Sequence, residues 1–393
     1  MLTTEKYREA APEDIQPMLD LRNQIFPPVT PTQFLSVPGL TAIVATAGDE
    51  TIGALPLAIR EFQLGPGETC KVAFLHAVGT HPAWRGRGVG QRMVAAAKES
   101  LRGRVEALFV YRTGGERTDG YTFYQKAGFH DLLFATTPLV KRKIFPDALQ
   151  GFHHTGPPEI IAREQTLLET FQALYGAFGG YWARQAGFYE RALQSSYYLS
   201  RPHEFSLFQV GAVAYAIVGR PLLPQDSHRR IILEIATLPG HEHEAHSLLT
   251  AIDKSAPPEA EIRFPTSTSS PLWPHVRSHI QDESVRSPVL LCCLLDPTAR
   301  AQRAWRDSGD APNVTAWTPK GDLSLHHHAA AKRTVTIGLK ENALLRLLLR
   351  RLDLPSACQI ESTTLHGAEP GDEALLARAF PAFPWVYHGL DYL

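Results

Sequence analysis

The chain has 393 residues, too many for one hydrophobic core and enough for two or three domains. Lysine and arginine total 39 and aspartate and glutamate 40, so the near-zero net charge argues against a general nucleic-acid binder. The chain contains no run of 18 apolar residues and no apolar N-terminal leader, so we expect neither a membrane span nor secretion. Four cysteines without framework spacing fit a reducing cytoplasm, and the adjacent Cys292 and Cys293 are expected on opposite faces of one strand.

A first domain is predicted over residues 1–145, with strands and helices in alternation. Its expected elements are a strand starting at residues 7–10, a helix over 12–22, a strand pair over 41–47 and 51–62, a strand over 72–78, a helix over 89–101 and a strand over 105–111. The loop between strand 72–78 and the following helix is rich in glycine and arginine.

This loop places glycines between the end of a strand and the N-terminus of the following helix. Backbone N–H groups there lack helical partners and the helix dipole is positive, so a pyrophosphate is the expected ligand. The segment Gly86-Arg87-Gly88-Val89-Gly90 lacks the Lys-Ser/Thr pair of a P-loop and the spacing of a dinucleotide fingerprint. It fits Arg-x-x-Gly-x-Gly instead, with Arg85, Gly88 and Gly90 at the defining positions.

The Arg-x-x-Gly-x-Gly pattern resembles the acyl-CoA loop of the GNAT acetyltransferases. Downstream, residues 121–129 read Tyr-Thr-Phe-Tyr-Gln-Lys-Ala-Gly-Phe and resemble the F-Y-x-x-x-G-F segment of that family. The alternative interpretation is a glycine-rich turn beside a packed aromatic helix. The resemblance implies acetyl-CoA as cosubstrate and no metal. The residues expected to bind the cosubstrate are Val78, Gly79, Thr80, Arg85, Gly86, Arg87, Gly88, Val89, Gly90 and Gln91.

Tyr124 is the candidate general acid. A phenol with a pKa near 10 stays protonated at neutral pH and can donate to a departing thiolate. The GNAT resemblance places a tyrosine at this point for that role, and the alternative is that Tyr124 only packs. No carboxylate in the first domain stands out as the base.

The second segment, residues 146–287, is predicted to repeat the order of the first. Its expected elements are helices over 164–174 and 246–255 and strands over 205–218, 230–237 and 261–264. Gly240-His241-Glu242-His243-Glu244 stands where the phosphate loop would be, so we interpret the segment as a degenerate second GNAT-like domain. The alternative is an unrelated α/β domain. His241, His243 and His246 match no standard metal-site spacing.

The third segment, residues 288–393, is expected to carry strands over 288–295 and 333–339 and a leucine-rich helix over 341–352. It resembles the sterol-carrier-like domain that follows two GNAT units. The whole chain therefore resembles the Eis-type (enhanced intracellular survival) acetyltransferases. The implied fold class is α/β (α+β), with two tandem GNAT-like mixed sheets, flanking helices and a sterol-carrier-protein-like C-terminal domain.

The Eis-type resemblance implies a homo-oligomer, specifically a hexamer, and offers the chain's own carboxylate on Leu393 as the general base. That family usually ends in an aromatic residue, whereas this chain ends in leucine. The aromatic tail over residues 380–393 favours a docked terminus, and the alternative is a frayed end.

The expected function is acetyl-CoA-dependent N-acetyl transfer to a small-molecule or lysine amine of the aminoglycoside or polyamine kind. The alternatives are a non-catalytic module that binds CoA or a lipid, and a carrier that uses a cavity of the C-terminal domain. We expect no nucleic-acid or membrane partner. The sequence does not identify the acceptor, because acceptor pockets are built from loops.

Overall fold

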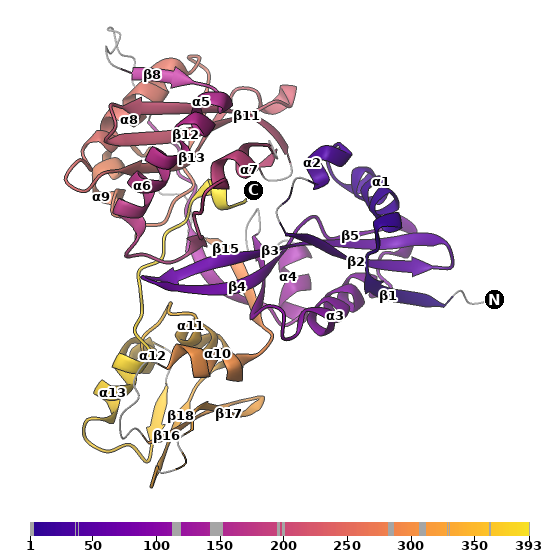
Figure 1. The fold of residues 1–393 in the computed structure, drawn as a ribbon, viewed down its shortest axis with the longest axis vertical. Helices are drawn as coiled ribbons and strands as arrows, with labels where there is room; N and C mark the ends of the chain where they lie inside the picture. Colours follow the sequence, from indigo (N-terminus) through magenta and orange to yellow (C-terminus); the bar gives the residue numbers. More distant parts are fainter. Residues whose placement is uncertain are drawn as a thin grey trace.

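The computed structural model describes residues 4–35, 37, 39–111, 119–141, 152–194, 197–198, 201–281, 287–305, 312–327, 329, 331–360 and 363–392. These residues form three mixed sheets with helices packed against them (Figure 1). The predicted mixed α/β class is therefore confirmed. Within the described part of the chain, no helix is long and apolar enough to cross a membrane.

The first sheet has the strand order β1-β2-β3-β4-β6-β15-β7. Its N-terminal strands are β1 (Glu5–Glu9), β2 (Leu40–Ala47), β3 (Glu50–Gly65), β4 (Glu68–Leu75), β5 (Gly79–Thr80), β6 (Ala107–Tyr111) and β7 (His130–Ala135). The accompanying helices are α1 (Ile15–Ile25), α2 (Pro31–Leu35), α3 (Val89–Leu101) and α4 (Asp119–Lys126). The element order matches the prediction for the first domain, with boundaries that differ by a few residues.

Strand β15 (Ser287–Leu294) lies between β6 and β7 and pairs antiparallel with both. The sequence placed this segment in the third domain, so that assignment is corrected: β15 belongs to the first sheet. The local sequence does not reveal this pairing, because β15 comes from far along the chain and fills the space between β6 and β7. Cys292 packs in the core on one face of the sheet and Cys293 in the core on the other, as the strand period predicts.

Two cores cover the two faces of the first sheet. Helix α3 lays Val89, Met93 and Ala97 against one face, where Leu75 also points. On the other face, Phe74 and Phe62 pack with residues of the second domain. The sheet therefore separates an α3 side from a second-domain side.

The second sheet has the order β10-β11-β12-β13-β14, with β8 beside β11. Its strands are β8 (Phe152–Thr155), β10 (Tyr197–Tyr198), β11 (Arg201–Val210), β12 (Ala214–Pro221), β13 (Arg229–Thr237) and β14 (Glu261–Arg263). Strand β9 (Tyr181–Trp182) instead pairs with β3 of the first sheet. The helices are α5 (Pro157–Ala162), α6 (Glu164–Tyr175), α7 (Phe188–Gln194), α8 (Glu244–Ser255) and α9 (Trp273–Val276). The expected single strand over 205–218 is a hairpin, because Gly211 turns the chain with a φ of 53°.

The third sheet has the order β17-β16-β18-β19. Its elements are β16 (Asn313–Thr318), β17 (Gly321–His326), β18 (Thr334–Gly338), β19 (Thr364–His366), α10 (Pro297–Ala304), α11 (Glu341–Leu348), α12 (Leu354–Ile360) and α13 (Asp372–Ala379). A buried ion-pair cluster ties this domain to the first one: Arg350 Nε lies 3.0 Å from Glu68 Oε2, and Arg300 also pairs with Glu68. Helix α11 ends at Leu348, short of the predicted Leu352, and Arg350 then adopts a left-handed φ of 62°.

The C-terminal tail leaves the third domain and runs back between the first two (Figure 1). Trp385 is fully buried, and its indole N–H donates to the Leu64 carbonyl at 3.2 Å. Val386 N donates to the Gly179 carbonyl at 2.9 Å. The described tail is therefore docked against the first two sheets, whereas Leu393 lies outside the described residues.

Candidate active site

The predicted phosphate loop forms an anion cradle at the start of α3. Gly86 and Gly88 adopt left-handed φ values of 74° and 79°, which glycine adopts without strain. Arg92 N donates to the Gly88 carbonyl at 3.1 Å as the first helical bond. Since the N-cap is glycine and provides no side-chain cap, the N–H groups of residues 89–91 stay available for a ligand.

A cavity of about 330 Å³ opens at this cradle. It is lined by Thr80, Trp84, Arg85, Gly86, Gly88, Val89, Gly90, Gln91 and Phe123. A Cβ at Gly90 would lie 3.0 Å from the Phe123 ring, so any larger residue there requires the ring to shift. Seven of the predicted cosubstrate residues line this cavity. An eighth, Gly79, adjoins it, because it pairs with β3 beside Thr80. Arg87 lies outside the lining, with its guanidinium 5.0 Å from the centre of the Trp84 ring.

Next to this cavity, two neighbouring strands of the first sheet stop pairing with each other. Strand β4 pairs in parallel with β6 only as far as Phe74 and Phe109. Beyond it the chain bulges at Ala77, which has a φ of 29°, and re-forms as β5 on β3. His81 N donates to the Ile52 carbonyl at 2.9 Å, so the Thr80 N–H, one residue earlier, faces away from β3. Val78 lies between this bulge and β5 and is half-buried against the core on the α3 side.

Tyr124 lies on α4, beside the α3 side of the first sheet. Its ring packs edge-on against Phe123 and Phe129, with centroids 5.0 and 5.5 Å away. Burial raises the pKa of the Tyr124 phenol above its usual value. Among the described residues, no hydrogen bond occupies its hydroxyl. The phenol is therefore protonated at neutral pH and free to donate.

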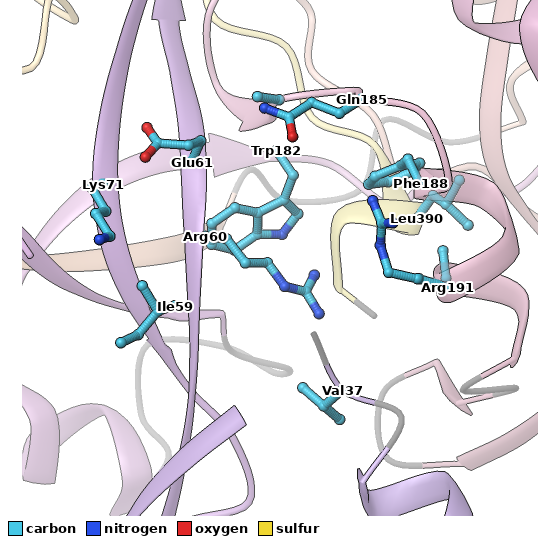
Figure 2. Close-up of a pocket in the computed structure, with 12 residues that line it drawn as sticks. Val37, Ile59, Arg60, Glu61, Lys71, Trp182, Gln185, Phe188, Arg191 and Leu390 are labelled. Carbon is cyan, nitrogen blue, oxygen red and sulfur yellow. The ribbon is translucent and has the colours of Figure 1, made fainter. Parts of the chain in front are cut away.

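A second cavity, of about 490 Å³, lies on the opposite side of the sheet (Figure 2). Its lining combines residues from β3, β4, α7 and the tail: Val37, Ile59, Arg60, Glu61, Lys71, Trp182, Ala183, Gln185, Phe188, Arg191, Ala192 and Leu390. The sequence analysis missed all of these residues. Only Arg60 and Glu61 carry a signal, because these two charges end the apolar run over residues 52–59. The others come together through the docking of domains.

Aromatic side chains connect this cavity to the bulge. Trp182 packs against Phe74 with ring centroids 5.7 Å apart, and Phe74 against His76 with centroids 4.5 Å apart. His76 directly precedes Ala77. Burial, with Arg60 and Arg22 as further causes, lowers the pKa of His76 to about 3, so its imidazole is neutral. Its Nε2 is buried without a hydrogen-bond partner among the described residues.

A buried ionic network holds the end of the tail beside this cavity. Arg184 pairs with Glu234 Oε2 at 2.6 Å and with Asp391. Trp182 N donates to Asp391 Oδ1 at 3.2 Å, and the Trp182 indole donates to the Asp391 carbonyl. Since Leu390 lines the cavity, the last described residues form part of its wall. Leu393, the predicted base, lies outside the described residues.

The histidine-rich and acidic segments raise the question of a cation site. In the part of the chain that the structure describes, no group of three His, Cys, Asp or Glu residues could hold a metal ion. His246, from the histidine-rich segment, is hydrogen-bonded through Nδ1 to His279 Nε2.

Comparisons with known proteins agree with this geometry. Residues 38–131 match the family model of the acetyltransferase (GNAT) domain, a range that includes the cradle and Tyr124. A search of curated proteins found no match. A GCN5-related N-acetyltransferase from Anabaena variabilis aligns with 97% of this chain and 98% of its own, with a TM-score of 0.67 at 13% identity. Eis1 from Mycobacterium abscessus aligns with 98% of this chain and 99% of its own, with a TM-score of 0.61 at 14% identity.

A tandem GNAT protein from the clavulanic acid biosynthesis pathway aligns with 75% of this chain and 99% of its own, with a TM-score of 0.50 at 15% identity. At these identities the structural likeness establishes the fold. Residues 38–131 thus match the model of a GNAT domain, and the fold of the whole chain is a tandem GNAT-like arrangement similar to that of Eis1.

Proposed function

We propose that this protein is an acetyl-CoA-dependent N-acetyltransferase that acts on amines. The observation that carries the proposal is the cradle at Gly86–Gln91, whose cavity is lined by Phe123 of α4, the neighbour of the protonated Tyr124. The N–H groups of residues 89–91 and the α3 dipole suit the pyrophosphate of CoA. The gap between β5 and β6, which the Thr80 N–H faces, suits the pantetheine arm.

Acetyl-CoA supplies the activated thioester when it is bound. The Val78 N–H is proposed to donate to the thioester carbonyl and so to polarise it. Tyr124 donates its proton to the departing thiolate. The amine is proposed to enter from the 490 Å³ cavity, so that the cosubstrate and the acceptor approach the bulge at Ala77 from opposite faces of the sheet.

We further propose that the carboxylate of Leu393 takes the proton from the amine. Support comes from the anchoring of Asp391 by Arg184 and Trp182, which keeps the tail within reach of the cavity. Adding two glycines after Leu393 displaces that carboxylate while leaving the anchor intact. Turnover should then fall by about 100- to 10,000-fold, the usual range for a general base, with acetyl-CoA binding unchanged. Full turnover of the extended protein would exclude this carboxylate.

The test of the activity itself is thiol release from acetyl-CoA with a panel of amines, scored against calorimetric binding of CoA. Binding with acceptor-dependent thiol release supports the enzyme. Binding without release from any amine would favour the alternative, a non-catalytic CoA-binding module.

A further inference from the structure

A short segment between α6 and α7 holds the C-terminal tail by backbone pairing. Gly179 N donates to the Pro384 carbonyl at 3.0 Å, and Val386 N donates to the Gly179 carbonyl at 2.9 Å. Gly179 and Trp385 therefore form a parallel β-bridge. The same segment continues as β9, which pairs with β3. The tail is thus bound through main-chain hydrogen bonds to a segment that the first sheet also holds, as in β-strand addition.

Glycine makes room for the tail at two consecutive positions. A Cβ at Gly179 would clash with the Leu64 carbonyl and would lie 2.7 Å from the indole nitrogen of Trp385. Gly180 has a φ of 97°, and a Cβ there would lie 2.6 Å from the Val386 carbonyl oxygen. Backbone atoms of β3 and of the tail cannot move aside without disturbing the packing around them. A larger residue at Gly179 therefore forces the tail away from β3.

A buried arginine fixes the last described residues of the tail. Arg184 Nη2 donates to Glu234 Oε2 at 2.6 Å, and Arg184 Nη1 donates to the Trp182 carbonyl at 3.0 Å. Nη1 also donates to Asp391 Oδ1, which accepts a second bond from Trp182 N at 3.2 Å. Arg184, Trp182 and Asp391 thus form a closed ring of hydrogen bonds. The planar guanidinium fork serves both carboxylates at once, which a lysine ammonium does not reproduce.

The second sheet supports this arginine from behind. The hydroxyls of Tyr189 and Tyr215 donate to Glu234 Oε1 at 2.6 and 2.9 Å. Tyr215 lies on β12 and Glu234 on β13, so the position of the arginine is set by that sheet. Leu390, next to Asp391, lines the 490 Å³ cavity. The second sheet therefore determines where the end of the tail lies in the cavity wall.

We propose that the second domain is a binding partner for the chain's own C-terminal segment, and that Gly179 and Arg184 are positioning residues for the reaction. This inference rests on the proposed acetyltransferase function. Both residues act through the tail, which places Leu390 in the wall of the acceptor cavity and the terminal carboxylate beside the amine. That carboxylate takes one proton from the amine as the nitrogen bonds to the acetyl carbon. The C–S bond breaks, and the thiolate receives the proton of Tyr124.

The experiment compares Gly179→Ala and Arg184→Lys with a matched control for each. Gly156→Ala makes the first change at a position of the second domain where a Cβ would lie 3.8 Å from its nearest neighbour, an ordinary contact. Arg220→Lys makes the second change in an exposed ion pair with Glu204. Release of C-terminal residues by a carboxypeptidase measures tail docking without catalysis. Calorimetry measures acetyl-CoA binding, and thiol release with spermidine, kanamycin and a lysine peptide gives kcat and KM.

We expect each test variant to lower kcat by about 100-fold, the loss that a misplacement of about 1 Å produces. The carboxypeptidase should release the C-terminal residues faster than from the wild type. The affinity for acetyl-CoA should stay unchanged, because the cradle at the start of α3 is untouched. Added formate should restore part of kcat, because a small carboxylate replaces the displaced one as base. Neither control should change any of these quantities.

The release rate separates this inference from the proposed function. If the wild type acetylates none of the three amines but Gly179→Ala and Arg184→Lys still speed release, the tail-binding role of the second domain stands and the transferase proposal fails. Faster release with wild-type kcat would overturn the positioning role and leave acetyl transfer intact. Release at the wild-type rate from both variants would overturn the inference altogether, whatever happens to kcat.

Discussion

Replacing Arg184 with methionine should destabilise the protein more than any other single change at the tail anchor. The side chain of Arg184 is 2% exposed and serves two carboxylates, Glu234 and Asp391, that are fully buried. Its guanidinium also lies 4.0 Å from the centre of the Phe188 ring. Arg184→Met leaves two unpaired buried charges, and loss of one partner of a buried pair costs about 3–5 kcal/mol.

The control is Asp391→Asn, which keeps the shape of the side chain and leaves Arg184 paired with Glu234. The free energy of unfolding should fall clearly less for Asp391→Asn, because the Arg184 cation then still pairs with the Glu234 carboxylate. Urea unfolding followed by tryptophan fluorescence reports both variants, and Trp182 and Trp385 lie at this junction. With a slope of about 1–3 kcal/mol per molar urea, the midpoint for Arg184→Met should fall by at least about 1 M.

The loss of stability caused by Arg184→Met should also depend on pH. Burial raises the pKa of Asp391 from its usual range to about 6, so the folded state binds this proton more tightly than the unfolded chain. The stability from this proton is present at low pH and is lost as pH rises through about 6. Arg184→Met removes the cation that opposes this shift, so its deficit should shrink between pH 8 and pH 5.5. A midpoint at pH 8 equal to that of Asp391→Asn would refute the reasoning.

The other predictions concern chemistry, domain docking and assembly. Tyr124→Phe should lower kcat by about 100- to 10,000-fold and leave CoA binding unchanged in calorimetry; unchanged kcat would remove the acid role. Glu68→Gln should leave Arg300 and Arg350 short of a buried partner, which costs about 3 kcal/mol and should speed proteolysis between the first and third domains; proteolysis at the wild-type rate would contradict this. Sedimentation at micromolar concentration should give a hexamer, the assembly implied by the Eis-type resemblance, and a monomer would exclude it.

The parts of the fold that local signals determine were predictable from the sequence. Apolar residues at helical spacing fixed α3, and glycines at its start indicated the cradle that Gly86 and Gly88 form. The turn at Gly48, with a φ of 62°, joins the expected strand pair β2 and β3. Each of these features depends on residues close together in the chain.

The features that depend on distant pairing were not predictable. An apolar run such as 288–295 predicts a strand but not its partners, and β15 joins the first sheet rather than the third. The tail anchor joins Trp182 and Arg184 to Asp391, more than 200 residues away. The second cavity likewise unites Arg60 with Arg191 only after α7 docks near β3.

The central claim is that the loop at the start of α3 holds the pyrophosphate of acetyl-CoA. The most direct test is calorimetric titration of acetyl-CoA into the wild type, Gly88→Glu and Gly103→Glu. Gly88 and Gly103 have φ values of 79° and 75°, so both variants add the same charge and the same backbone strain, but Gly103 lies at the other end of α3. The account predicts wild-type affinity for Gly103→Glu and a loss of at least about 100-fold for Gly88→Glu, since several charge-assisted bonds are lost. Equal affinity of the two variants would contradict it.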